Sequence, residues 1–98
     1  MHVRFLDLAL FEVVFTLQRR LQVPRSEIRS RMLEIIELPT ILIPGKKRWR
    51  RTFDLYVGPA LSFADAFHVA TIERQPEREI VSFDSDFDRL PGITRIEP

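Results

Sequence analysis

Between Ser62 and Leu90, acidic residues lie at two consecutive boundaries of expected secondary-structure elements, and their spacing could support metal chemistry. Asp65 falls just inside an expected helix start, and Asp84 and Asp86 follow directly on the apolar run 80–83. Carboxylates without His or Cys select a hard cation that keeps several waters, so Mg²⁺ or Mn²⁺ is expected ahead of Zn²⁺. Such an ion polarises a phosphoryl oxygen and activates a bound water. The expected reaction is therefore hydrolysis of a phosphodiester.

A third acidic candidate, Glu12, lies in an expected helix from Asp7 to about Gln22. Its neighbours at helical spacing include Leu8 and Phe15, and a carboxylate among apolar groups needs a cation or hydrogen-bond donors to stay ionised. Glu12 is therefore a candidate metal ligand. The alternative is a glutamate on the flank of the helix that reaches water.

Asp65 also has a purely structural interpretation. The sequence Ser62-Phe63-Ala64-Asp65 matches a capping box, in which the serine hydroxyl and the acid satisfy free backbone amides of the first helical turn. Ser62 would then support the helix start, and Asp65 could be a cap, a metal ligand or both.

The alternating Asp84, Asp86 and Asp88 resemble the start of an EF-hand calcium loop, but the comparison fails. The sixth position holds Arg89 instead of Gly, and the twelfth holds Arg95 instead of Glu. We therefore favour Asp84 at the strand end as the ligand, Asp86 as a water-mediated helper and Asp88 as a turn residue. Ser82, on the same strand face as Asp84, could hydrogen-bond a metal-bound water or be a small buried hydroxyl.

Short apolar segments alternate with longer amphipathic ones along the chain, which indicates an α/β domain with a short parallel sheet. The expected strands are 3–6, 40–43, 80–83 and 93–96, and the expected helices are 7–22, 24–36, 46–57 and 62–76. Ligands of open parallel sheets bind beyond the carboxyl ends of the strands. Glu12 and Asp84 follow predicted strands and Asp65 begins a helix, so the three acids are expected to converge.

The apolar positions predict which faces are buried. The expected core side chains of the four helices and strand 40–43 are Leu10, Val13, Val14, Leu17, Leu21, Ile28, Met32, Leu33, Ile35, Ile36, Ile41, Leu42, Ile43, Trp49, Phe53, Tyr56 and Val57. Trp49 is expected to be core instead of a stacking platform. His68, alone in a mostly apolar helix, is expected to be a packed core or edge histidine.

A basic segment fills the rest of helix 46–57. Its members are Lys46, Lys47, Arg48, Arg50 and Arg51. They could hold a polyanion such as RNA, or they could form a solvated face or a partner-binding patch.

Composition bounds the protein class. A chain of 98 residues that is 45% hydrophobic is expected to be one domain spanning 1–98. With no cysteine there is no disulfide framework and no thiol catalysis, which fits a reducing compartment. No apolar run is long enough to cross a bilayer, no signal peptide is recognisable, and a cytoplasmic location is expected. Nucleotide-binding, zinc-protease and serine-hydrolase motifs are also missing.

The segment from Ser62 to Leu90, with its acids at the two boundaries, resembles the C-terminal half of a PIN domain, the fold of VapC-type ribonuclease toxins. That family typically shows a Ser/Thr-x-x-Asp-Ala/Cys helix start and a later strand ending in Ser/Thr-x-Asp-x-Asp-Phe, and segments 62–66 and 82–87 match both. Segment 7–15 also resembles the stretch where the family places an acid on a helix. The resemblance implies that Glu12, Asp65 and Asp84 are metal-binding acids, with Ser82 and Asp86 in supporting roles.

The family's opening strand, which ends in Asp-Ser/Thr-Asn and lies at the centre of the sheet, has no counterpart here, and the chain contains no asparagine. We therefore expect an N-terminally incomplete PIN-like three-layer α/β/α domain whose neighbouring strand edges are left unpaired. A misassigned start codon, a decayed gene or a second chain that fills the gap would each account for this. Because that strand carries a principal metal ligand, catalysis by this chain is expected to be impaired.

The leading hypothesis is a Mg²⁺-dependent endoribonuclease, the toxin of a toxin-antitoxin pair, with RNA as substrate and a cognate antitoxin as partner. A homodimer would be compatible with it. The alternative is a non-catalytic PIN-fold module that binds a protein partner through its apolar and basic helices. A phosphoacceptor resembling a response-regulator receiver fits less well, since the paired acids of an early strand and a late Lys are missing.

Overall fold

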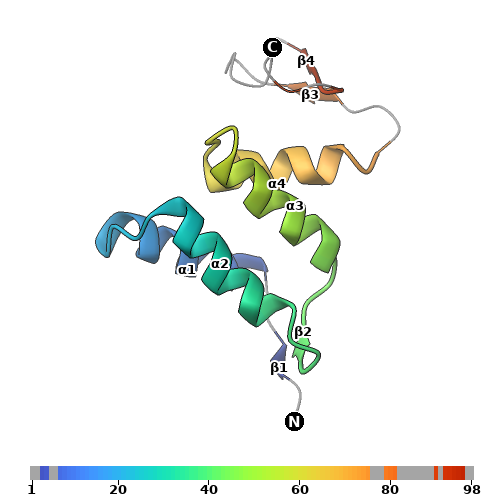
Figure 1. Ribbon diagram of the computed structural model, residues 1–98. Helices are drawn as coiled ribbons and strands as arrows, with labels where there is room; N and C mark the ends of the chain where they lie inside the picture. Colours follow the sequence, from blue (N-terminus) through green and yellow to red (C-terminus); the bar gives the residue numbers. More distant parts are fainter. Residues whose placement is uncertain (1–2, 5–6, 76–78, 82–89, 91, 97–98) are drawn as a thin grey trace.

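The computed structural model describes residues 3–4, 7–75, 79–81, 90 and 92–96. The elements, in chain order, are β1 (Val3–Arg4), α1 (Asp7–Phe15), the π-helical turn η1 (Thr16–Arg20), α2 (Arg25–Ile36), β2 (Ile41–Leu42), α3 (Lys46–Val57), α4 (Phe63–Ile72), β3 (Glu79–Val81) and β4 (Thr94–Ile96) (Figure 1). The predicted alternation of short strands and helices is confirmed. The helix expected over 7–22 is divided into an α-helical part and a π-helical turn.

The π-helical turn ends where the chain leaves the helix before α2. Leu21 N donates to Thr16 O at 3.2 Å, which is the five-residue spacing of a π-turn, and Val23 N donates to Leu17 O at 2.9 Å. Gln22 then adopts a positive φ of 51°. Such a conformation is uncommon for a non-glycine residue and turns the chain towards Pro24 and the next helix.

The described strands pair in parallel, as predicted, but they form two separate sheets. β1 pairs with β2, with Val3 opposite Ile41, and β3 pairs with β4, with Ile80 opposite Arg95. Figure 1 shows the two pairs at opposite ends of the body formed by the helices. A single short sheet was expected; within the described residues no strand lies between the pairs to join them.

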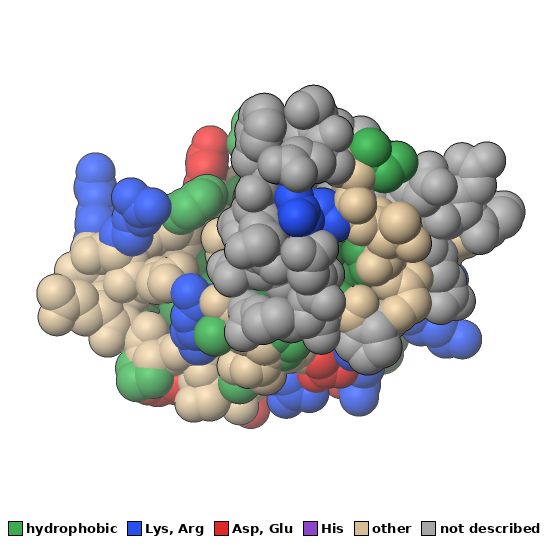
Figure 2. Space-filling view, turned by 90° about the horizontal axis from the view of Figure 1, so that it is seen from above, with side chains coloured by type: hydrophobic (Ala, Val, Ile, Leu, Met, Phe, Trp, Pro, Cys, Tyr) green, Lys and Arg blue, Asp and Glu red, His purple; other side chains and the backbone are tan. Residues whose placement is uncertain are grey.

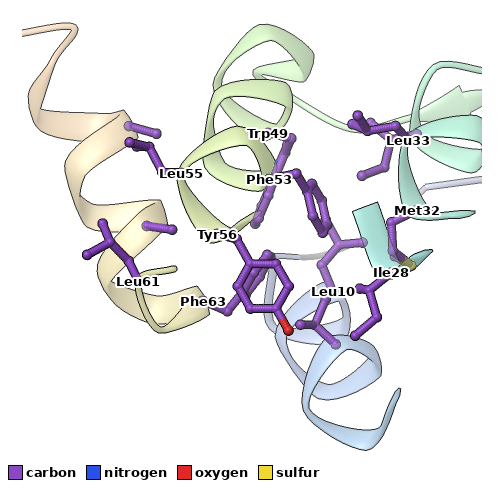
Figure 3. Close-up of a cluster of buried hydrophobic side chains, with 14 of the residues drawn as sticks. Leu10, Ile28, Met32, Leu33, Trp49, Phe53, Leu55, Tyr56, Leu61 and Phe63 are labelled. Atoms are coloured by element: carbon purple, nitrogen blue, oxygen red, sulfur yellow. The ribbon is translucent and has the colours of Figure 1, made fainter. Parts of the chain in front are cut away.

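The core is built mainly between helices (Figure 3). Trp49, Phe53 and Tyr56 of α3 are fully buried, as their spacing on one helical face predicts. They meet Phe63, the first residue of α4, whose ring centroid lies 5.1 Å from that of Phe53 and 5.5 Å from that of Tyr56. The ring of Phe11 on α1 lies 5.1 Å from Phe63 as well. Phe63 therefore fixes the start of α4 against both α1 and α3.

Several apolar side chains that were predicted to be buried are exposed. They are Val13, Leu21, Ile35 and Leu42. In α1, Leu10 and Val14 are buried, while Phe11 of α1 and Leu17 of η1 are half-buried against the core. The buried stripe is therefore narrower than the sequence pattern predicts. Within the described residues, no helix has both the length and the apolar character needed to cross a bilayer.

Candidate functional site

Asp65 lies in the first turn of α4, where Ser62 caps the helix. The Ser62 hydroxyl oxygen accepts a hydrogen bond from Asp65 N at 3.2 Å, so the serine half of the predicted capping box is confirmed. In the described part of the chain, Ser62 N donates no hydrogen bond to the Asp65 carboxylate, so the second half of the capping box is not formed. The half-buried carboxylate is therefore not used for the cap, and it remains able to accept from an external group.

The chain before α4 is held by Arg25. Its Nη1 donates to the carbonyl oxygens of Tyr56 at 2.9 Å and Leu61 at 2.5 Å, and its guanidinium carbon lies 4.4 Å from the centroid of the Tyr56 ring. These contacts close the loop between α3 and α4, in which Ala60 has a positive φ of 60°. Arg25 was not predictable from the sequence, because its partners are backbone oxygens more than thirty positions away.

Tyr56 extends this network to the π-helical turn. Its hydroxyl donates to Gln18 Oε1 at 2.8 Å, which joins α3 to η1. Burial raises the pKa of Tyr56 above its ordinary value, while the nearby positive charge of Arg25 acts in the opposite direction. Tyr56 thus stays protonated and continues to donate over the neutral range.

Glu12 is exposed on α1, so the prediction that it lies among buried apolar groups is wrong. Its neighbours Leu8 and Phe15 are themselves 68% and 42% exposed. Glu12 lines an open hollow whose other lining residues are Phe15, Thr16, Arg19 and Arg20. The alternative, a glutamate that reaches water, therefore describes its position; the structure does not test its predicted role as a metal ligand.

The remaining predicted ligands, Asp84 and Asp86, and the supporting Ser82 lie outside the described residues. Within the residues that are described, no group of three or more His, Cys, Asp or Glu side chains could hold a metal ion. Glu12 and Asp65 offer carboxylate oxygens, which fit a hard divalent cation. These described donors alone do not complete a site for one.

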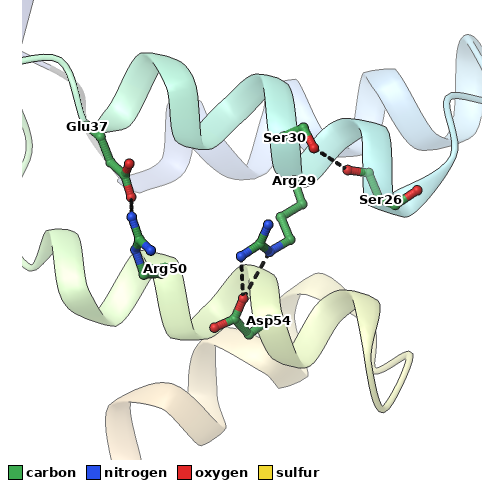
Figure 4. Close-up of polar contacts among 6 residues, drawn as sticks. All are labelled: Ser26, Arg29, Ser30, Glu37, Arg50 and Asp54. Carbon is green, nitrogen blue, oxygen red and sulfur yellow. Dashed lines mark hydrogen bonds and ion pairs between the residues drawn. The ribbon is translucent and has the colours of Figure 1, made fainter.

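Most of the predicted RNA-binding segment is engaged within the protein. Arg50 pairs with Glu37 of the α2 C-cap (Figure 4), and Arg51 binds both carboxylate oxygens of Glu73, at 2.9 and 3.0 Å. The hydrogen bond to Glu73 raises the pKa of Arg51. These two pairs attach α3 to its neighbours on either side. A third pair of the same kind joins Arg29 of α2 to Asp54 of α3 at 2.9 Å (Figure 4).

The other basic side chains of this segment behave differently from one another. Lys46 Nζ donates to Leu38 O at 3.0 Å. Arg48 is half-buried, with its guanidinium carbon 4.8 Å from the Phe67 ring centroid and one nitrogen 3.9 Å from a carboxylate oxygen of Asp7. Lys47 is exposed, without an ion pair in the described part of the chain. On the face shown in Figure 2, Lys and Arg side chains stand apart and form no single patch among the described residues.

Two further predictions concern aromatic and imidazole side chains. Trp49 is fully buried, which confirms it as core. Its ring lies 4.8 Å from that of Phe67 and 6.1 Å from that of Phe63. His68 is exposed, so of the two predicted positions, packed core or edge, the core position is wrong. Its side of α4 faces away from the side that carries Val69 and Ala70 into the core.

The described residues form an α/β domain with parallel strands, as the alternation of short apolar and longer amphipathic segments predicts. Asp65 lies at the capped start of one of its helices. The family model described as the PIN domain matches residues 2–93. The chain therefore belongs to the PIN domain family. The PIN domain is generally a nuclease fold, and proteins with this domain typically use a divalent metal. Neither a curated protein nor a solved structure gave a significant match.

Proposed function

We propose that this protein is a Mg²⁺-dependent endoribonuclease of the VapC type, the toxin of a toxin-antitoxin pair. The observation that carries the proposal is the family match over residues 2–93, which includes the helix start with Asp65 and the segment with Asp84. Phosphodiester hydrolysis is the chemistry that carboxylate-rich sites of this kind support. A cytoplasmic location and a cognate antitoxin belong to the same proposal.

In this proposal Asp65, Asp84 and Glu12 hold the ion, Asp86 assists through water, and Ser82 orients a water molecule. The bound ion would supply charge neutralisation at the scissile phosphate and lower the pKa of a water. The cap by Ser62 and the packing of Phe63 hold the backbone of the first turn of α4, from which the Asp65 side chain extends. Preorganisation of this kind is what a metal-binding carboxylate needs.

The proposal is tested by incubating labelled single-stranded RNA with the 98-residue protein, with Mg²⁺ or with a chelator. We expect weak cleavage that requires Mg²⁺ and is abolished in Asp84→Asn and Asp65→Asn, since each loses a negatively charged ligand. Glu34→Gln is the matched control, because Glu34 is exposed on α2 and lies far along the chain from every predicted ligand. Cleavage that persists in both Asn variants, or no cleavage with either Mg²⁺ or Mn²⁺, contradicts the enzyme proposal.

A second candidate function, a non-catalytic interaction module, is favoured by one specific observation. Large apolar side chains are exposed on α1, at the end of η1 and on α2, among them Leu8, Phe15, Leu21 and Ile35. Exposed apolar groups of this size often mark a surface that a partner covers. A co-encoded small protein, or a second copy of the chain, would be the partner.

Metal titration distinguishes the two functions. A nuclease is stabilised by its ion, so its melting temperature rises with Mn²⁺ concentration. If Mn²⁺ leaves the melting temperature unchanged while the co-encoded protein copurifies with the chain, the interaction module is the better account. A rise that is lost in Asp65→Asn favours the nuclease.

A further inference from the structure

Arg19 and Arg20 of η1 differ from the cations of α3. Both are exposed, and in the part of the chain that the structure describes neither takes part in an ion pair. By contrast, Arg50 and Arg51 are each paired with a glutamate. A cation without an internal ion pair keeps its charge available for an external anion. Among the described residues, the π-helical turn therefore carries accessible positive charge next to Glu12, a predicted site residue.

The two arginines line the same hollow as Glu12, together with Phe15 and Thr16. The hollow is open to solvent and has a volume of about 430 Å³. The hollow thus combines two guanidinium groups, an aromatic ring, a hydroxyl and one of the predicted metal-binding acids. All five side chains come from one continuous helical segment.

The types of these side chains suit single-stranded RNA. Guanidinium groups bind phosphate oxygens in a bidentate manner. The Phe15 ring is 42% exposed, and the guanidinium carbon of Arg19 lies 5.6 Å from its centroid. The Arg19 guanidinium thus lies over the ring, and unpaired bases stack on aromatic rings and on guanidinium planes alike, so this exposed pair offers a stacking surface.

We propose that Phe15, Arg19 and Arg20 bind single-stranded RNA, with phosphates at the two arginines and a base on the Phe15 ring. This inference rests on the proposed function, in which RNA is the substrate. It assigns the main RNA contact to the π-helical turn and the adjoining Phe15 instead of to the basic segment of α3. Because Glu12 lines the same hollow, a strand bound here passes beside a predicted metal ligand. An acidic protein segment would pair with the arginines but has no base to stack on the exposed pair of Phe15 and Arg19.

The test is fluorescence anisotropy of labelled uridine-rich RNA with the full 98-residue protein, in chelator, so that binding is measured without cleavage. Arg19→Ala and Arg20→Ala should each weaken binding about fivefold and lower the salt slope by about 0.7, the contribution of one phosphate contact on a single strand. Phe15→Leu should weaken binding about tenfold and leave the salt slope unchanged, because it removes only stacking. Thermal unfolding of each variant checks that it is folded.

Arg74→Ala is the matched control, since Arg74 is also exposed and also has no ion pair among the described residues. It should change affinity by less than about twofold. Lys47→Ala tests the basic segment of α3 in the same assay. The proposal is overturned if the two η1 variants bind RNA like the wild type, if Lys47→Ala has the larger effect, or if a polyglutamate peptide binds the arginines more tightly than RNA does.

This result is separable from that of the cleavage assay. If RNA binding depends on Arg19, Arg20 and Phe15 but no Mg²⁺-dependent cleavage is found, the RNA contact holds and the nuclease proposal fails. If cleavage is found while the three variants bind and cleave like the wild type, the nuclease proposal holds and the RNA contact is overturned.

Discussion

At the scale of single residues, the best defined part of the candidate site is the first turn of α4. The Ser62 hydroxyl satisfies Asp65 N, and the neighbouring Phe63 is 2% exposed among aromatic rings. The same few residues thus provide a cap, a core anchor and an acid. The cap and the acid do not compete, because the described Asp65 carboxylate is not hydrogen-bonded to the cap.

The cap leads to a stability prediction. Ser62→Ala leaves Asp65 N without its partner and should lower the free energy of unfolding by about 1 kcal/mol, as for other helix N-caps. Chemical denaturation followed by the fluorescence of the single tryptophan, Trp49, measures the change. Ser62→Asp, which can still accept the hydrogen bond, should restore most of the loss. Equal losses in both variants would show that the hydroxyl has no capping role.

Tyr56 gives a prediction for alkaline pH. Its pKa is raised by burial, so the folded state binds the phenolic proton more tightly than the unfolded state does. The contribution of Tyr56 to the free energy of unfolding is fully present at pH values below the unfolded-state pKa of about 10. It is lost as the pH rises through the pKa of Tyr56 in the folded state. Because Tyr56 is the only tyrosine, the ultraviolet absorbance of tyrosinate reports its titration directly. A midpoint at or below that of a free tyrosine contradicts the prediction, and Tyr56→Phe should remove this part of the alkaline loss.

At the scale of elements, α3 is the centre to which the other helices attach. Its apolar face packs on α1 and α4, and its basic side chains pair with Glu37 and Glu73 on the two flanking helices. The segment that was expected to hold RNA therefore contributes to helix packing. Exposed ion pairs of this kind are individually weak. Apolar burial accounts for most of the stability of the helical body.

The loop between α3 and α4 depends on Arg25 of α2. Arg25→Ala removes two hydrogen bonds to backbone oxygens and should lower the free energy of unfolding by about 2 kcal/mol. The backbone amides of Gly58 and of residues 60–62 should then exchange with solvent faster than in the wild type. Arg25→Lys should restore only part of the loss, since an ammonium group cannot reproduce the planar stacking on Tyr56. Unchanged exchange in this loop would mean that Arg25 does not hold it.

The sequence was most informative where local patterns decide the outcome. The capping serine, the buried face of Trp49, Phe53 and Tyr56, and the parallel strands were all predictable from spacing and residue type. The exposure of Glu12 was not predictable, because the residue types at helical spacing do not reveal whether another element covers that side of the helix. Arg25 was also out of reach, since its partners are brought close only by tertiary packing. For Asp84 and Asp86, which lie outside the described residues, the predicted roles stay predictions.

At the scale of the whole molecule, the described strands form two small parallel pairs on either side of a helical body (Figure 1). Each pair contains only two or three residues per strand. Pairs this short contribute few protected backbone hydrogen bonds. The contact between α3 and α4, by contrast, contains four buried aromatic side chains, Trp49, Phe53, Tyr56 and Phe63 (Figure 3). The stability of the molecule is therefore expected to be uneven.

Hydrogen exchange measured by NMR tests this expectation. Amides in the centre of α3 and α4, such as Phe53 and Val69, should exchange only through global unfolding, because their side chains are buried. Amides in β1 and β4 should exchange through local opening, with protection lower by more than about tenfold. Equal protection of strands and helices would show that the strand pairs are part of a larger cooperative unit.

The proposed role of this PIN domain requires its carboxylates to hold a divalent metal, which calorimetry with Mn²⁺ measures. We expect saturable binding to the wild type that is lost, or weakened by more than about tenfold, in Asp65→Asn and in Asp84→Asn but retained in the control Glu34→Gln. Binding that is equal in all four proteins, or no binding to the wild type, contradicts it.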